Sequence, residues 1–202
     1  VVEILFTNKV WGDLIDGILA EHSQAGAHTT DQINEKTADA GVTVDGVKIK
    51  DKGFPEFPRC AITNSTNYTI TSQQDPLTKL AFDTELFDVG GMHDNSTNNS
   101  RITIPSGEGG TYEVIFIICW VGNATGYRRA TLYKNNSLLY DVSVINGEVA
   151  GLGTQKFTEH LLVSANAGDY FEMYVSQTSG GDLVLYGNIY GGGTEFQMIK
   201  LA

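Results

Sequence analysis

Oxygen-rich side chains at residues 94–99 offer the first candidate for ligand chemistry. This segment alternates carboxylate, amide and hydroxyl oxygens, which are the ligands that calcium prefers in proteins. It lacks the central glycine and the distant glutamate of an EF-hand loop. Asp83, Glu85 and Asp88 form a second calcium candidate shortly before it. Because solvated loops share this composition, we predict no bound cofactor and keep calcium as the alternative.

Spacing typical of zinc binding or nucleophilic catalysis is not found in the sequence. There is no His-Glu-x-x-His pattern, no paired-cysteine zinc spacing and no Gly-x-Ser-x-Gly. The histidines are scattered through the chain: His22, His28, His93 and His160. A carboxylate pair for glycoside hydrolysis is defined by a separation of about 5–9 Å, which only the fold determines. We therefore predict ordinary surface or core histidines and no enzymatic activity.

The two cysteines, Cys60 and Cys119, leave two interpretations open. Cys119 lies in an apolar run and is predicted to be a small core residue. A Cys60–Cys119 disulfide is the alternative, because sequence alone does not fix connectivity.

The charge balance excludes some classes of partner. The chain has 13 Lys and Arg against 24 Asp and Glu, a net charge of -11. A nucleic-acid-binding protein needs a basic face that displaces counterions, so nucleic acid is not an expected partner. No apolar run approaches the ~20 residues that span a bilayer, so membrane insertion is not expected either. The 23 glycines and only 4 prolines favour a turn-rich, all-β protein.

The apolar run at residues 111–121 is the element around which the chain is expected to fold. From Val114 to Val121 no residue is charged, and β-branched and aromatic side chains dominate. Glycines on both sides bound the run like turns, which predicts a strand that is apolar on both faces. One face needs a second sheet and the other needs a different cover. A partner subunit is the predicted cover.

The first 53 residues contain amphipathic pieces without a core of their own. Apolar residues at helical spacing predict a helix at 11–22, and a capping box at 29–32 predicts a second short helix through about residue 36. Residues 42–50 alternate apolar and polar types around Asp-Gly, which predicts a β-hairpin. Such pieces make sense if several copies wind around one axis. Two prolines in the segment 54–58 then mark a boundary.

Past residue 53 helical periodicity is absent, and short strands alternate with Asn, Asp and Gly turns, which indicates a sandwich or barrel. Residues 59–78 are predicted to form an irregular or weakly stranded entry segment. The predicted strands span residues 79–83, 101–104, 111–121, 127–134, 138–145, 154–164, 170–176, 183–189 and 194–201.

Several separated motifs in residues 79–202 resemble the complement-type and tumour-necrosis-factor-like (TNF-like) jelly rolls. There an Asp-bearing entry segment leads to a short strand ending in proline, then Gly-x-Tyr and a long central strand. The matching segments here are 82–88, 101–105, 110–114, 128–135 and the closing strand 194–202. The resemblance implies an all-β jelly-roll β-sandwich.

A second resemblance concerns the beginning of the chain. Residues 35–50 resemble the shaft segment of bacteriophage virion fibres, and residues 11–19 and 28–32 resemble what commonly precedes it there. In those proteins the shaft often ends in a jelly-roll head. The two resemblances together imply a homotrimeric virion fibre with a short α/β stalk at 1–53 and a head domain at 54–202. The missing Gly-x-y repeat argues against an animal secreted protein.

The implied function is adhesion of a phage to its host through a surface glycan or protein receptor, with other virion proteins as further partners. Three heads per fibre would turn weak single contacts into firm attachment. The first alternative is a structural virion component, such as a head fibre or capsid decoration protein. The second is a secreted ligand of the TNF or complement type.

Strand parity predicts the contact surfaces. If the final strand runs back toward the stalk, the turns at 135–136, 166–169 and 190–193 lie together at the far tip. Tyrosine and asparagine side chains can stack on and hydrogen-bond to sugars, although plain turn residues are the alternative. The predicted receptor-binding residues are Asn135, Asn136, Asn166 and Tyr190. The predicted trimer core comprises Trp11, Ile15, Ile18, Tyr112, Phe116, Ile118 and Trp120.

Overall fold

The structure is a computed structural model of the 202-residue chain, and it describes residues 42–44, 47–49, 56–145, 153–187 and 192–202. The chain divides into two units, Val1–Pro55 and Glu56–Ala202. The predicted helices at 11–22 and 29–36 lie outside the described residues. Within the described parts every regular element is a β-strand, and no helix there is long and apolar enough to cross a membrane.

The first unit contains the predicted hairpin. Strands β1 (Val42–Val44) and β2 (Val47–Ile49) pair antiparallel, with Val42 opposite Ile49 and Val44 opposite Val47. The Asp-Gly pair separates the two strands, as expected for a two-residue connection. The hairpin prediction is confirmed.

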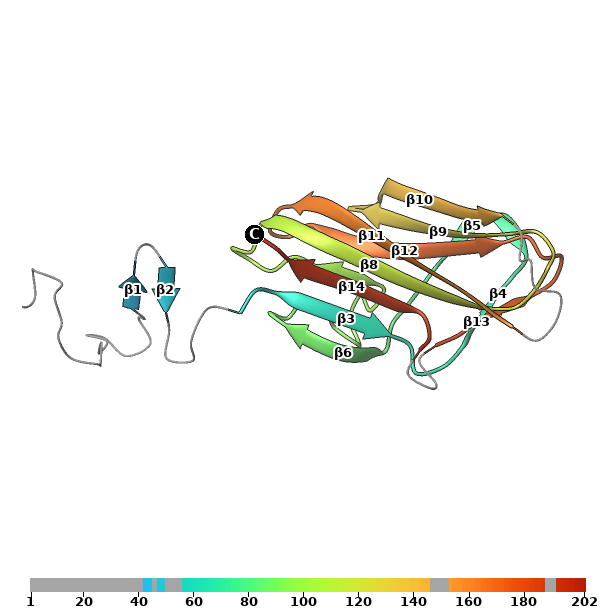
Figure 1. The fold of residues 1–202 in the computed structure, drawn as a ribbon, viewed down its shortest axis with the longest axis horizontal. Coiled ribbons are helices and arrows are strands. Elements are labelled where there is room, and N and C mark those ends of the chain that lie inside the picture. Colours follow the sequence, from blue (N-terminus) through green and yellow to red (C-terminus); the bar gives the residue numbers. More distant parts are fainter. Residues whose placement is uncertain (1–41, 45–46, 50–55, 146–152, 188–191) are drawn as a thin grey trace, which may run out of the picture. The chain divides into compact units, whose positions relative to one another are not determined.

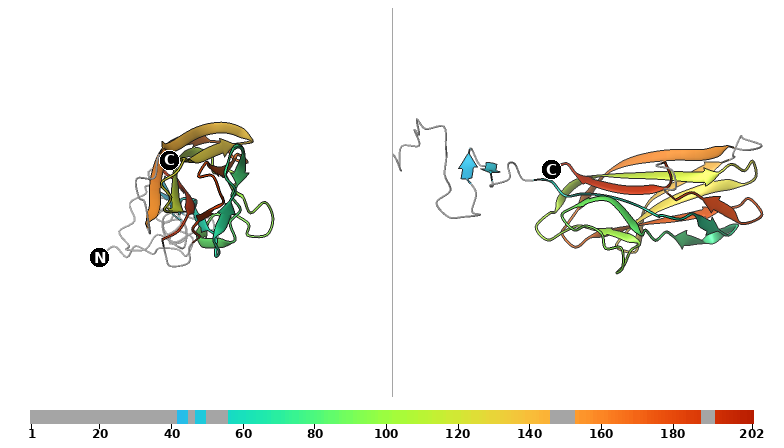
Figure 2. Two further views of the ribbon diagram at one scale, coloured as in Figure 1. Left: turned by 90° about the vertical axis from the view of Figure 1, so that its right-hand side faces the viewer. Right: turned by 90° about the horizontal axis from the view of Figure 1, so that it is seen from below.

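The second unit is a sandwich of two antiparallel sheets (Figure 1). One sheet has seven strands in the order β4-β13-β8-β14-β3-β6, with β11 also paired to β8. The other has five strands in the order β10-β9-β12-β5, with β7 also paired to β12. Figure 2 shows this unit end-on, with the strands surrounding the interior. The strands are β3 (Arg59–Thr63), β4 (Tyr68–Ile70), β5 (Gln73–Lys79), β6 (Thr84–Val89), β7 (Arg101–Thr103), β8 (Gly110–Val121), β9 (Tyr127–Lys134), β10 (Ser137–Ile145), β11 (Thr154–Ala165), β12 (Tyr170–Gln177), β13 (Leu183–Leu185) and β14 (Glu195–Lys200).

The long strand β8 organises the core. It pairs with β14 on one side and, along its whole length, with β11 on the other. Because side chains alternate along a strand, residues 112, 114, 116, 118 and 120 point into the sandwich, and each is at most 1% exposed. Residues on the facing sheet complete this core: Ala130, Leu132, Phe171, Met173 and Val175.

Most strand predictions are confirmed. Seven predicted strands agree with the observed ones to within one residue at each end: β7, β8, β9, β10, β11, β12 and β14. Strand β13 is shorter than predicted and ends at Leu185. Alternation and turn chemistry located these strands because each strand keeps the same kind of residue, apolar or polar, along at least one of its faces.

Two predictions before residue 90 differ from the structure. Residues 59–78 were predicted to be irregular or weakly stranded, and residues 59–63 form the well-paired strand β3, which lies between β14 and β6. Residues 80–83, predicted as part of a strand, follow β5 without strand pairing. Leu80 and Phe82 are fully buried there, and their N–H groups donate to the carbonyls of Met173 and Asn99. The alternation of apolar and polar residues at 80–83 therefore arises because Leu80 and Phe82 insert into the core, and not because the segment belongs to a sheet.

Candidate functional site

Four residues of the predicted trimer core instead fill the interior of this chain. Tyr112, Phe116, Ile118 and Trp120 belong to the sandwich core and have no exposed surface to offer a neighbour. That part of the prediction is wrong, because an uninterrupted apolar run does not show which of its faces turns inward. The other three predicted core residues, Trp11, Ile15 and Ile18, lie outside the described residues.

The opposite side of the seven-stranded sheet, here called the outer face, is the surface that these four residues leave open. The strand registers align its residues in three rows: Leu162-Glu113-Ile199-Arg59, His160-Ile115-Gln197-Ala61-Phe87 and Thr158-Ile117-Glu195-Thr63. Leu162 is 72% exposed and Phe87 39% exposed, while Ile115 and Ile117 are half-buried. The outer face thus has aliphatic residues in its middle strands, with charged and amide groups among them.

Asn135 and Asn166 meet at one end of the sandwich, around Asp169. The Nδ2 group of Asn135 donates to Asp169 Oδ1 at 2.7 Å, and the backbone N–H of Asn166 donates to Asp169 Oδ2 at 2.8 Å. Hydrogen bonding from Lys134, then from Asn166 and Asn135, lowers the pKa of Asp169 to about 2. Asn136 is exposed, and both Asn135 and Asn136 adopt the positive φ of a tight hairpin turn.

The prediction that these turns share a tip with residues 190–193 is wrong. The Asp169 turn follows Ala165, which pairs with Gly110 at the end of the sandwich that also holds Pro58 and Ala202 (Figure 1). Residues 192–193 precede β14, whose first residue pairs with Ile117, so they lie toward the opposite end. Tyr190 itself lies outside the described residues. Counting strands along the sequence gave the wrong result here, because the order of strands in the two sheets decides which turns share an end.

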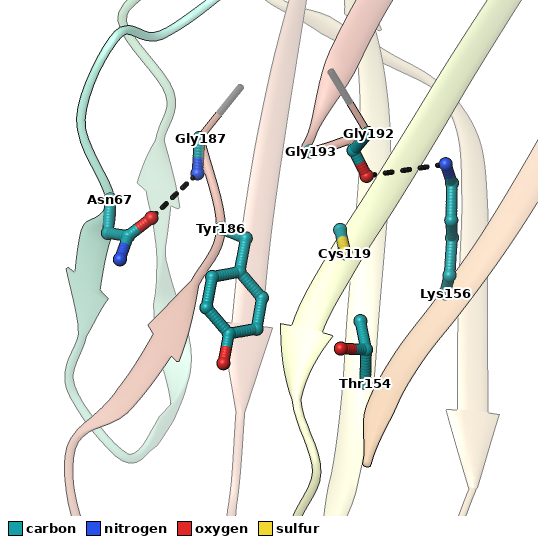
Figure 3. A pocket seen from close by; sticks show the side chains of 8 residues that line it. All are labelled: Asn67, Cys119, Thr154, Lys156, Tyr186, Gly187, Gly192 and Gly193. Carbon is teal, nitrogen blue, oxygen red and sulfur yellow. Dashed lines mark hydrogen bonds between the residues drawn. The ribbon is translucent and has the colours of Figure 1, made fainter. Parts of the chain in front are cut away.

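A pocket of about 620 Å³ lies at that opposite end of the seven-stranded sheet, past the three rows of the outer face (Figure 3). The lining residues come from five separate segments of the chain: Asn67, Cys119, Thr154, Lys156, Tyr186, Gly187, Gly192 and Gly193. In Figure 3 the Tyr186 ring and the Lys156 side chain lie on either side of Cys119 and Thr154. An aromatic ring, an ammonium group, a hydroxyl and backbone groups therefore surround one space.

Backbone contacts fix the walls of this pocket. The N–H of Tyr186 donates to the carbonyl of Cys119 at 2.7 Å, which ties the segment after β13 to β8. Gly187 approaches the loop after β3 so closely that a Cβ atom would lie 2.1 Å from the carbonyl oxygen of Thr66. Its N–H donates to Asn67 Oδ1 at 3.1 Å. A glycine is required at 187 because any side chain would displace this wall.

Lys156 is the cation of the pocket. Its Nζ donates to the carbonyl of Gly192 at 3.3 Å, and no ion pair joins it to a carboxylate in the described part of the chain. Burial raises the pKa of the Cys119 thiol, and the charge of Lys156 opposes that effect. Lys156 is thus the only charged side chain among the lining residues that the structure describes.

Three solved structures align with most of the sandwich. The globular domain of a zebrafish complement 1qA protein matches with 13% identity and a TM-score of 0.47, covering 72% of this chain and 98% of that one. Eiger TNF from S. frugiperda matches with 12% identity and a TM-score of 0.50, covering 73% and 94%. Murine APRIL matches with 10% identity and a TM-score of 0.49, covering 71% and 99%. The fold is a TNF-like jelly roll.

At these identities the similarity shows the fold alone. The jelly-roll prediction is confirmed by the two-sheet architecture together with the match to Eiger TNF. No protein-family model and no curated protein matches the chain.

The calcium candidates of the jelly roll cap its loops. Asp83 accepts hydrogen bonds from the N–H and hydroxyl of Ser65 at 2.7 and 2.6 Å. Asp88 accepts from two N–H groups of the loop after β6, and Asp94 accepts from the N–H groups two and three residues ahead of it. Glu85 bonds to a histidine ring. No group of three His, Cys, Asp or Glu side chains in the described residues could hold a metal ion.

The two histidines in the described part of the jelly roll differ in environment. The His93 ring is fully buried, with Nδ1 at 3.1 Å from Glu85 and Nε2 at 3.2 Å from the carbonyl of Asn99. His160 is exposed on the outer face, with Nδ1 at 2.9 Å from Glu113. Each ring thus holds neighbouring segments together.

Both cysteines are free thiols, so the disulfide alternative is wrong. Cys60 faces the sandwich interior as part of the core, whereas Cys119 lies on the outer side of the same sheet. The two side chains therefore point to opposite faces and cannot approach each other. Burial raises the pKa of both thiols.

This difference predicts unequal thiol reactivity. Cys119 is 4% exposed and lines the pocket, whereas Cys60 is 0% exposed, so iodoacetamide is expected to modify Cys119 slowly and Cys60 only after unfolding. Mass spectrometry of peptides from native and urea-treated protein measures this. Equal labelling of both thiols in the native protein would contradict the burial of Cys60.

Sequence reasoning missed the pocket residues Asn67, Lys156 and Tyr186. The only local signal was a tyrosine beside glycine, close to the glycine-rich segment 191–193. No sequence spacing relates Lys156 to Tyr186, because β8 lies between their strands in the sheet.

Proposed function

We propose that the protein is an adhesion protein: the self-associating, receptor-binding head of a homotrimeric bacteriophage fibre. The supporting observation is the outer face, where Ile115, Ile117 and Ile199 occupy the middle strands and Leu162 stands 72% exposed beside them. Apolar residues that are half-buried or exposed in a single chain and lie among polar ones characterise protein interfaces. A face of this kind on the seven-stranded sheet favours burial against identical copies of the chain.

The threefold assembly and the phage setting come from the sequence resemblances. The TNF-like and complement-like motifs imply a trimer, and residues 35–50 resemble the shaft of virion fibres. A trimer would present three copies of every loop at each end of the sandwich. Several weak contacts to a host-surface glycan or protein receptor then combine into firm attachment. In this proposal the protein binds and does not catalyse, and it resides in the virion.

The fold also favours a second candidate function. A secreted ligand of the TNF or complement type would have the same sandwich and the same need for self-association, as the match to Eiger TNF illustrates for the fold. Immunogold labelling of purified phage particles distinguishes the two, because a secreted ligand would not be found on a virion. Labelling of the capsid instead of the fibres would support a structural virion component.

Light scattering coupled to gel filtration tests the assembly. The wild-type chain is expected at about three times its mass of 21.9 kDa at micromolar concentration. Ile117→Asp places a charge in the middle of the outer face and is expected to give the single-chain mass, with an unchanged far-UV circular dichroism spectrum.

Leu77→Asp is the matched control, because Leu77 is a half-buried leucine on β5 of the other sheet. This variant is expected to keep the wild-type mass. A wild-type protein that remains a single chain, or an Ile117→Asp variant that keeps the oligomeric mass, would reject assembly through the outer face.

A further inference from the structure

The pocket beyond Ile117 has the dimensions and location of a ligand site. Its volume of about 620 Å³ falls within the ~300–1,000 Å³ that small-molecule sites occupy. It opens at the end of the sandwich that lies opposite Pro58 and Ala202. It is therefore separate from the Asn135–Asp169 cluster at the other end.

The walls suit a ring with one apolar face and several hydroxyl groups. The Tyr186 ring offers a flat apolar surface, and the exposed backbone of Gly192 lies across the pocket from it (Figure 3). A pyranose presents its C–H groups on one side and its hydroxyl groups at the edge. A sugar can thus stack on the tyrosine while its hydroxyls reach polar groups of the wall.

Asn67 and Thr154 supply those polar groups. Asn67 accepts from Gly187 N–H through Oδ1, and its Nδ2 group donates to no atom among the hydrogen bonds of the described residues. The Thr154 side chain is exposed at the start of β11 and points into the same space (Figure 3). An amide donor and a hydroxyl that acts as donor or acceptor are a small set of polar groups of the kind that orients a ligand.

Lys156 determines the charge of the ligand. The other lysines between residues 56 and 202 form ion pairs: Lys79 with Glu172, Lys134 with Asp169 and Lys200 with Glu108. Among the described residues, Lys156 Nζ bonds only to the carbonyl of Gly192, at 3.3 Å. An ammonium group that lines a pocket without a carboxylate partner favours an anionic ligand through a charge-assisted hydrogen bond.

We propose that this pocket binds a carboxylate-bearing sugar, with Lys156 pairing with the carboxylate, Tyr186 stacking on the ring and Asn67 and Thr154 bonding to hydroxyl groups. The inference deepens the proposed function, because it names the class of glycan and the residues of the receptor site.

Titration of the wild-type protein with free monosaccharides, followed by nuclear magnetic resonance of its backbone amides, tests the proposal. Galacturonic acid and N-acetylneuraminic acid are expected to shift the amides around Cys119, Thr154 and Gly187. Galactose, the neutral counterpart of galacturonic acid, is expected to bind about tenfold more weakly, because it lacks the carboxylate.

Three variants locate the contacts. Lys156→Gln is expected to weaken galacturonic acid about tenfold and to leave galactose unchanged, because it removes a charge-assisted hydrogen bond. Tyr186→Ala is expected to weaken both sugars. Lys134→Gln removes a lysine at the other end of the sandwich and is expected to change neither.

Equal affinity for galactose and galacturonic acid, or equal loss in Lys156→Gln and Lys134→Gln, would overturn the role of the charge. No shift at the pocket with any of the three sugars would overturn the site itself. The proposed function fails separately, if the wild type is a single chain or does not adhere to cells. A wild type that assembles and adheres, with unchanged adhesion in Lys156→Gln and Tyr186→Ala, rejects only the pocket.

Discussion

Trp120→Ala is expected to lower the free energy of unfolding by about 3–5 kcal/mol, as large-to-small substitutions of buried aromatic residues do. Trp120 is fully buried near the end of β8, in register with Gln155 on β11 and Leu185 on β13. Alanine would remove most of the side chain and leave a cavity that close-packed neighbours fill only in part. Urea unfolding followed by far-UV circular dichroism measures the change.

Leu139→Ala is the control for Trp120→Ala, because Leu139 is 43% exposed on β10 and should cost less than about 0.5 kcal/mol. Protein concentration is kept constant, since self-association adds to apparent stability. If Trp120→Ala left the urea midpoint unchanged and reduced the oligomeric mass, Trp120 would lie at an interface between subunits. The sequence alone predicted an interface position for Trp120. The packing of the core predicts the loss of stability instead.

Glu172→Gln is the second large effect, with an expected loss of about 2–3 kcal/mol. Glu172 is fully buried, yet its carboxylate accepts from Lys79 Nζ at 3.0 Å through both oxygens and from Arg101 Nη2 at 3.4 Å. These contacts join β5 and β7 to β12. Glutamine would leave two cations without their counter-charge. The cations are partly exposed, so the loss is smaller than for a fully buried pair.

The pH dependence of this loss has a defined sign. Burial raises the pKa of Glu172, but hydrogen bonds and charges from Lys79, Ser100 and Arg101 outweigh it, so the folded pKa lies below the ordinary value of 4.5. The stabilisation is therefore fully present above pH 4.5 and is lost as the pH falls below it. The difference between wild type and Glu172→Gln, measured by urea unfolding at several pH values, should shrink in that range.

Glu56→Gln is the comparison for Glu172→Gln. Glu56 is 66% exposed and pairs with Arg59 at 3.7 Å, so its loss should cost less than about 0.5 kcal/mol at any pH. A loss in Glu172→Gln no larger than in Glu56→Gln would show that the buried network contributes nothing net to stability. A difference that grows on acidification would contradict the lowered pKa.

Local patterns predicted the strands well wherever apolar and polar residues alternate, or where turn residues bound an apolar run. Strand β9 was predicted exactly, and the ends of β8 and β12 were placed to within one residue. The segment Arg59–Thr63 was not predicted as a regular strand because Arg, Cys, Ala, Ile and Thr show no clear alternation, and its pairing partners are 21 or more residues away. Residues 80–83 were predicted as part of a strand because apolar and polar residues alternate there. A loop that inserts every second side chain into the core shows the same alternation.

Side-chain period and turn chemistry are local properties, so they are enough to establish that the chain past residue 53 is all-β, turn-rich and built around the apolar run at 111–121. Three features became clear only in the folded chain: which face of that run is interior, which turns share an end, and that Lys156 and Tyr186 line one pocket. These features depend on strand order and register. A shift of one residue would exchange the two faces of β8, and the order of strands brings together residues that no sequence spacing connects.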